Sequence, residues 1–132
     1  MKNNRLTSDR IMEDMKIKLS LLWVAAMFSW AYGDLMRMYS GDYIPGELGG
    51  FLATQEMWLV SSILMMIPVA MIFLSLTLKE KANRWANTII GIFFTGFNLI
   101  GLPSYSTAYD QFLIIVGLVF TALIVWYAYK WK

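Results

Sequence analysis

An aspartate and an arginine interrupt an otherwise apolar segment near the start of the chain. The run "LSLLWVAAMFSW" continues as "AYGDLMRM", so Asp34 and Arg37 lie three residues apart, close enough to pair on one helix surface. Ionisable side chains at membrane depth are costly, and by default they mark functional sites. Two interpretations stay open. Either Asp34 anchors a ligand, or Asp34 and Arg37 form an ion pair that only fixes the helix.

Other polar and aromatic side chains are predicted to gather at the same end of the molecule. We expect an outward-facing pocket with Asp34 or Glu56 as the charged anchor, Asn98 as a hydrogen-bond partner, and aromatic walls suited to a cation or a flat apolar ligand. The candidate ligand-binding residues are Trp30, Asp34, Arg37, Glu56, Thr95 and Asn98. In the alternative interpretation, Glu56 and Asp110 begin helices whose dipoles favour a negative charge, and Asn98 only holds helices together.

The composition of the chain indicates that these residues belong to a membrane protein. Of the 132 residues, 58% are hydrophobic and 15% are charged, whereas a soluble domain has about 25% charged residues. A bilayer, which needs about 20 mostly apolar residues for each helical span, accommodates this apolar excess. The apolar runs are continuous and about twice as long as the alternating strands of a membrane β-barrel, which argues against a barrel.

Four apolar runs are long enough to span a bilayer, at about residues 19–36, 57–78, 85–102 and 112–129. Because they leave no room for a soluble domain, we predict a single all-α membrane domain, a four-helix transmembrane bundle. Residues 1–18 mix apolar and charged side chains at helical spacing, and we expect them to form a short helix on the inner membrane surface. We expect the first span to be retained, although Ala31 and Gly33 resemble a signal-peptide cleavage site.

The distribution of basic residues predicts the orientation of the spans. Ten of the eleven Lys and Arg residues precede span one, lie between spans two and three, or follow span four, and only Arg37 lies on the other side. Since basic residues stay in the cytoplasm, both termini are predicted to be cytoplasmic. We expect a multi-pass protein of the bacterial cytoplasmic (inner) membrane, whose basic rim contacts anionic lipid rather than nucleic acid.

Small and polar residues predict which faces of the spans look inward. In the third span Asn87, Gly91, Thr95 and Asn98 fall within a sector of about 80°, which we expect to face the bundle interior. The fourth span has only Gly117 and Thr121 as a packing face, and we expect it to be the most lipid-exposed.

A proline in the middle of the second span predicts a kink. Pro68 lacks a backbone N–H and frees the carbonyl of Leu64, which we expect Thr95 or Asn98 to satisfy. We therefore predict a packing stripe that includes Asn87, Gly91 and Pro68.

The absence of cysteine and histidine narrows the possible chemistry. Disulfides, thiol chemistry and the common thiolate or imidazole metal sites are unavailable. We therefore predict no metal site, no cofactor and no catalytic residue.

Three segments of the chain carry a resemblance to a known family. The segments are "LSLLWVAAMFSWAYGDL", "IPVAMIFLSLTLKEKANRWANTIIG" and "LIVWYAYKW". From about Lys16 onward the chain resembles an uncharacterised bacterial family of small four-span integral membrane proteins, known only as a domain of unknown function. The resemblance implies the fold and no activity.

Three functional hypotheses follow from these patterns. The leading one is a protein that binds or transports a small amphipathic or cationic molecule; a cavity of roughly 300 Å³ or more beside Asp34 would favour it. The second is an accessory or structural subunit within a homo-oligomer or larger membrane complex, favoured by tight closure around an Asp34–Arg37 pair. The third, an enzyme using Asp34 and Glu56 as acid and base, is least favoured because the chain offers no nucleophile or metal cluster.

Overall fold

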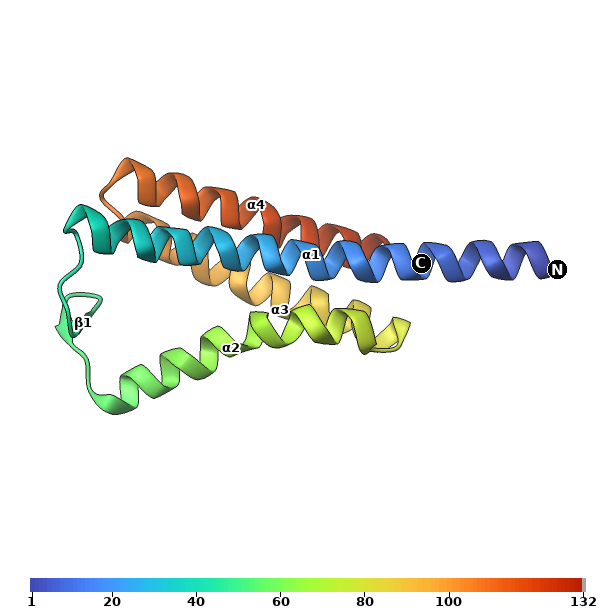
Figure 1. Cartoon of the computed structure of the whole chain (residues 1–132), viewed down its shortest axis with the longest axis horizontal. Helices are drawn as coiled ribbons and strands as arrows, with labels where there is room; N and C mark the ends of the chain where they lie inside the picture. The colour runs from blue at the N-terminus through green and yellow to red at the C-terminus, as the bar shows by residue number, and fades with distance from the viewer. Residues whose placement is uncertain (132) are drawn as a thin grey trace.

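The computed structural model describes residues 1–131, which form four long helices with a small β-hairpin between the first two (Figure 1). Each of the four helices is long and apolar enough to cross a membrane, so the predicted all-α four-helix bundle is confirmed. The elements in chain order are α1 (Lys2–Ser40), β1 (Glu47–Leu48), β2 (Phe51–Leu52), α2 (Gln55–Thr77), α3 (Glu80–Gly101), the short 3-10 helix η1 (Leu102–Ser104) and α4 (Ala108–Lys130).

The two ends of the bundle differ in what they carry. At one end lie the β-hairpin, the end of α1 and the beginnings of α2 and α4; we call it the hairpin end (Figure 1). At the other lie the α2–α3 connection and the C-terminus, with Lys79, Lys81 and Lys130 nearby; we call it the basic end. The candidate site lies toward the hairpin end.

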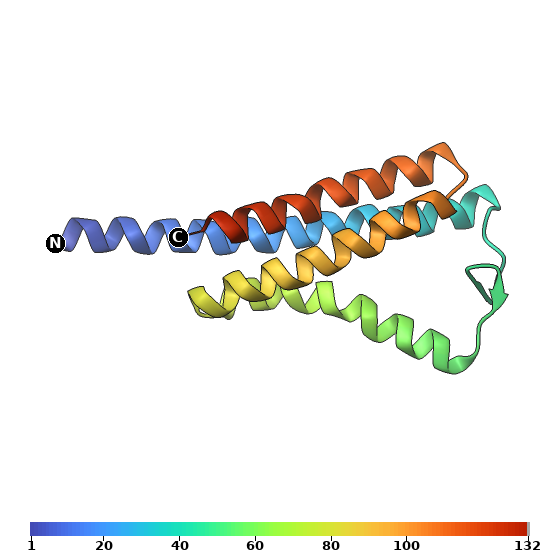
Figure 2. The ribbon, with the colours of Figure 1, turned by 180° about the vertical axis from the view of Figure 1, so that it is seen from behind.

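Helix α1 is longer than predicted. Residues 1–18, expected as a separate surface helix, instead continue without a break into the first span, and their N-terminal part projects beyond the other helices (Figure 2). No proline or glycine occurs before Gly33 to interrupt the 39-residue helix. At 1.5 Å per residue α1 is about 58 Å long, against about 30 Å for the apolar core of a bilayer.

The bundle core is built where α1, α3 and α4 pack together with the second half of α2. Its buried apolar side chains come from all four helices and include Trp23, Met71, Phe94 and Ile124, which are fully inaccessible. Trp23 meets Phe94 edge to face with ring centroids 6.1 Å apart. These contacts place the aromatic row of α1 against α3.

Helix α4 is packed more deeply than predicted. Besides Gly117 and Thr121, it buries Asp110, Ile114 and Ile124, so the expectation that it is the most lipid-exposed span is wrong. Gly117 and Gly91 explain the close packing: a Cβ at Gly117 would lie 2.5 Å from Trp30 Nε1, and one at Gly91 would lie 2.8 Å from Val125 Cγ2. Helix α2, which buries only Pro68, Met71 and Ser75, is the peripheral helix instead.

A buried polar network ties α1, α2 and α3 together toward the basic end. Asn87 Oδ1 accepts hydrogen bonds from Trp23 Nε1 at 2.7 Å and from Ser75 Oγ at 3.1 Å, while Asn87 Nδ2 donates to Asn83 Oδ1 at 2.6 Å. Asn83 Nδ2 donates in turn to the Ser75 carbonyl at 2.6 Å. Asn83, Asn87 and Ser75 are fully buried, so this network replaces the water that these groups lose on folding.

The two halves of α2 differ sharply in packing. The half after Pro68 is held by the Asn87 network and by Ser20 Oγ, which donates to the Ile72 carbonyl at 2.8 Å. The half before Pro68 contains no buried residue and diverges from the other helices (Figures 1 and 2). Thr95 and Asn98 do not bond the Leu64 carbonyl as predicted; they donate to Gly91 and Phe94 of their own helix.

Candidate functional site

An ion pair between α1 and α4 organises the hairpin end. Arg37 Nε donates to Asp110 Oδ2 at 2.8 Å, and Thr107 Oγ1 donates to the same oxygen at 3.0 Å. The Arg37 guanidinium carbon also lies 4.3 Å from the ring centroid of Tyr105, which is a cation–π contact. Asp110 is only 4% exposed, so its charge depends on Arg37 for compensation.

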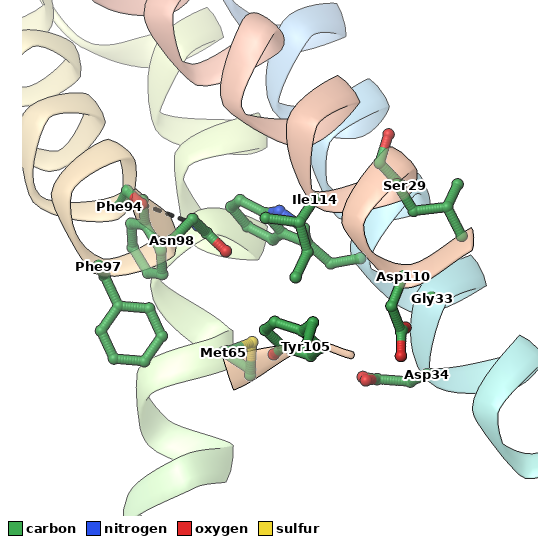
Figure 3. Close-up of a pocket in the computed structure, with 12 residues that line it drawn as sticks. Ser29, Gly33, Asp34, Met65, Phe94, Phe97, Asn98, Tyr105, Asp110 and Ile114 are labelled. Carbon is green, nitrogen blue, oxygen red and sulfur yellow. Dashed lines mark hydrogen bonds between the residues drawn. The ribbon is translucent and has the colours of Figure 1, made fainter. Parts of the chain in front are cut away.

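Asp34 is left without a partner by this arrangement. Among residues 1–131 no side chain donates a hydrogen bond to its carboxylate. The ion pair between Asp34 and Arg37, one of the two interpretations of the sequence, does not form. Figure 3 shows the carboxylates of Asp34 and Asp110 directed into one space beside Tyr105. The site thus contains two carboxylates and one guanidinium, and only Asp110 pairs with that guanidinium, which leaves one formal negative charge in excess.

The unpaired carboxylate borders a cavity of about 100 Å³ between the four helices. This cavity is smaller than the roughly 300 Å³ expected of a pocket for a drug-sized ligand. It has room for a few water molecules or one small cationic group. The lining residues are Ser29, Trp30, Gly33, Asp34, Met65, Phe94, Phe97, Asn98, Tyr105, Asp110, Leu113 and Ile114.

Aromatic rings form much of the cavity wall. Trp30 stacks on Phe94 with ring centroids 5.6 Å apart, and Phe97 and Tyr105 lie nearby (Figure 3). Within the described residues, the Trp30 indole N–H is buried and has no hydrogen-bond acceptor. The faces of aromatic rings attract cations. The aromatic wall and the negative charge of Asp34 therefore both favour a cation in the cavity.

The predicted site residues separate into two groups. Trp30, Asp34 and Asn98 line the cavity together, with the Asn98 amide held by the Phe94 carbonyl at 2.8 Å (Figure 3). Arg37 acts beside the cavity through Asp110. Thr95 does not line it.

Glu56 lies in a different place from the other predicted residues. It borders an open groove of about 440 Å³ along the first turns of α2, with Leu48, Thr54, Met57, Val60 and Ser61. It belongs to the first turn of α2, where the helix dipole favours an acidic side chain. Glu56 is therefore not a second anchor in the cavity.

Two residues that were not among the candidates, Asp110 and Tyr105, prove to be part of the site. The chain did contain a signal for Asp110, since Thr107 and Asp110 have the Thr-x-x-acid spacing that commonly begins a helix. That spacing indicates a helix start and says nothing of Arg37. No pattern in the sequence points to Tyr105, which approaches Arg37 only because η1 turns the chain between α3 and α4.

The four apolar helices indicate a multi-pass membrane protein, and a small cavity that contains an unpaired carboxylate lies near one end of the bundle. Residues 10–132 match a family of unknown function, DUF6326, and the chain belongs to this family. No curated protein and no solved structure matches the chain. Membership of this family implies no activity.

Proposed function

We propose that this protein binds or transports a small amphipathic or cationic molecule in the cytoplasmic membrane of a bacterium. The hairpin end faces outward in this proposal, and Asp34 is the anchor for the cation. The observation that carries the proposal is the unpaired carboxylate of Asp34, beside a guanidinium already engaged by Asp110. Carboxylates within membrane-spanning segments commonly mark substrate or ion pathways.

The size and chemistry of the cavity favour an ammonium head group. A volume of about 100 Å³ excludes a drug-sized molecule but accepts a small cation. Asp34 supplies the charge, the side-chain oxygen of Asn98 supplies a hydrogen-bond acceptor, and the rings of Trp30 and Phe97 supply apolar and cation–π contacts.

The charge distribution along the chain supports the proposed orientation. Lys79, Lys81 and Lys130 lie at the basic end, together with most other basic residues, and basic residues mark the cytoplasmic side of a membrane protein. The cavity then opens toward the outside of the cell.

Calorimetric titration of tetramethylammonium into the purified protein in uncharged detergent tests the proposal. We expect wild-type protein to bind, and Asp34→Asn to bind about tenfold to a hundredfold more weakly. Tetramethylammonium has no N–H, so the loss is the Coulomb attraction between carboxylate and cation, about 1–4 kcal/mol at 4 Å between bulk water and a protein surface. Glu56→Gln is the matched control and should bind like wild type, because Glu56 lies outside the cavity. Absence of binding, or equal binding by wild type and Asp34→Asn, would overturn the proposal.

A second candidate function is that of an accessory subunit in a membrane complex. The observation that favours it is the first half of α2, where Leu59, Val60 and Ile63 are exposed and no residue is buried. A partner helix seated there would give a larger complex on isolation in mild detergent. A monomer that binds tetramethylammonium through Asp34 would favour the first function.

A further inference from the structure

The cavity and the open groove lie along the same face of α2. Met57 and Ser61 border the groove, and Met65 borders the cavity. These three residues are spaced by four, so they follow one another on one side of the helix. Ser61 and Met65 are one turn of α2, about 6 Å, apart, and the whole face from Met57 to Met65 is about 12 Å long.

The two spaces have complementary properties. The cavity is small and carries an unpaired carboxylate. The groove is larger, about 440 Å³, and its apolar residues Leu48, Met57 and Val60 lie beside Thr54, Glu56 and Ser61. The first half of α2 diverges from the bundle (Figure 1), and the groove beside it is open at the protein surface. A small charged space one helical turn away from a larger, mainly apolar groove suits a molecule with a cationic head and an alkyl tail.

We propose that the ligand is a single-chain cationic amphiphile, whose head binds at Asp34 and whose tail lies along the Met57–Ser61–Met65 face of α2. This inference rests on the proposed function and adds the class of ligand and its route. The tail reaches the site from the outer leaflet of the membrane through the opening between α2 and the rest of the bundle. Charge complementarity at Asp34 orients the molecule, so the head enters the cavity and the tail stays in the groove.

The packing of α2 supports this route. Pro68 stands at the boundary between the half fixed by the Ser20 and Asn87 hydrogen bonds and the half without buried residues. A proline removes one backbone hydrogen bond at such a boundary and lets the two halves of a helix diverge. The divergence exposes the face of α2 that would otherwise close against α1 and α3.

Cysteine protection in nanodiscs of phosphatidylcholine tests the inference, since the chain has no native cysteine. Ser61→Cys places a thiol in the groove, and Ile63→Cys, at a position 58% exposed, is the matched control outside both spaces. We expect dodecyltrimethylammonium to slow maleimide labelling of Ser61→Cys by about fivefold or more and to leave Ile63→Cys unchanged. Tetramethylammonium, which has the head without the tail, should protect neither.

The outcomes separate the inference from the proposed function. If tetramethylammonium binds through Asp34 while dodecyltrimethylammonium leaves Ser61→Cys unprotected, the tail site is overturned and the cation site stands. If neither compound binds wild-type protein, the proposed function itself fails. Protection that persists when Asp34→Asn is added to Ser61→Cys would also overturn the inference, because the tail would then bind without the anchored head. A thiol at position 61 already protected without added ligand, in protein that isolates as a dimer or larger complex, would assign the groove to a second chain.

Discussion

Arg37 on α1 donates its hydrogen bond to Asp110 on α4, 73 positions along the chain, and not to Asp34 one turn away on its own helix. Because Arg37 pairs with Asp110, the carboxylates of Asp110 and Asp34 have different roles. Asp110 is buried, hydrogen-bonded and neutralised, so it joins α1 to α4. Asp34 has no ion-pair partner in residues 1–131 and lines the cavity.

Substitution of the two carboxylates should therefore have opposite consequences. Asp110→Asn leaves Arg37 without its buried counter-ion and should lower the stability of the folded bundle by about 1–3 kcal/mol, seen as a lower melting temperature in detergent. Asp34→Asn removes an unpaired carboxylate and should change the melting temperature little while weakening the binding of tetramethylammonium about tenfold to a hundredfold. A larger loss of stability for Asp34→Asn than for Asp110→Asn would contradict the assignment of roles.

Gly117→Ala should destabilise the contact between α1 and α4. The added methyl group would lie 2.5 Å from Trp30 Nε1, so the indole must shift, at a cost of about 1–3 kcal/mol. Gly96→Ala is the control, since a Cβ there meets nothing within 4 Å and alanine favours a helix over glycine by about 1 kcal/mol. Thermal unfolding followed by circular dichroism should rank Gly96→Ala at or above wild type and Gly117→Ala below it.

Asn87→Ala should be among the most destabilising polar substitutions. It leaves the Trp23 N–H and the Ser75 hydroxyl without their shared acceptor in a fully buried position, with an expected cost of about 1–3 kcal/mol for each unsatisfied group. Asn98→Ala removes only a bond to the carbonyl of its own helix and should cost much less. Equal melting temperatures for the two variants would show that the network does not hold the helices together.

Asp42 gives the hairpin end a pH dependence at acid pH. The hydroxyl of Tyr109, and then that of Ser40, donate to its carboxylate and hold the pKa of Asp42 below its ordinary value of 3.8. Because the pKa is lower in the folded state than in the unfolded one, this link between α1 and α4 is fully present above pH 3.8 and is lost as the pH falls through the folded-state pKa.

Removal of the tyrosine hydroxyl should raise that pKa. Tyr109→Phe takes away the main donor, so a carbon-13 NMR titration should find the pKa of Asp42 closer to 3.8 than in wild type. Tyr39→Phe, at a position 81% exposed, is the control and should leave the titration of Asp42 where it is. An unchanged midpoint in Tyr109→Phe would mean that the hydroxyl does not bond Asp42 in solution.

The number and place of the helices could be predicted from the sequence because a span must be apolar along its whole length. The inward-facing polar stripe of α3 could also be predicted, because Asn87 and Gly91 differ from their apolar neighbours. Both residues are buried. The packing of α4 could not be predicted from the sequence. Ile114 and Ile124 face the core while similar side chains face outward, and no difference in polarity distinguishes the two faces.

The site was only partly predictable for a related reason. Asp34, Trp30 and Asn98 were identified, but the partner of Arg37 depends on how α1 packs against α4, which local spacing does not determine. The β-hairpin was missed although Gly49 and Gly50, both at positive φ, form the dipeptide that favours a two-residue turn.

Helix α1 is continuous, so its two ends belong to one rigid element. The segment that protrudes past the basic end and the turn that bears Asp34 share a continuous ladder of backbone hydrogen bonds, with no glycine or proline between them until Gly33. A rotation or axial push applied near Arg5 is therefore delivered to the carboxylate with little loss on the way. The protruding segment of α1 and the turn that bears Asp34 are therefore expected to move together.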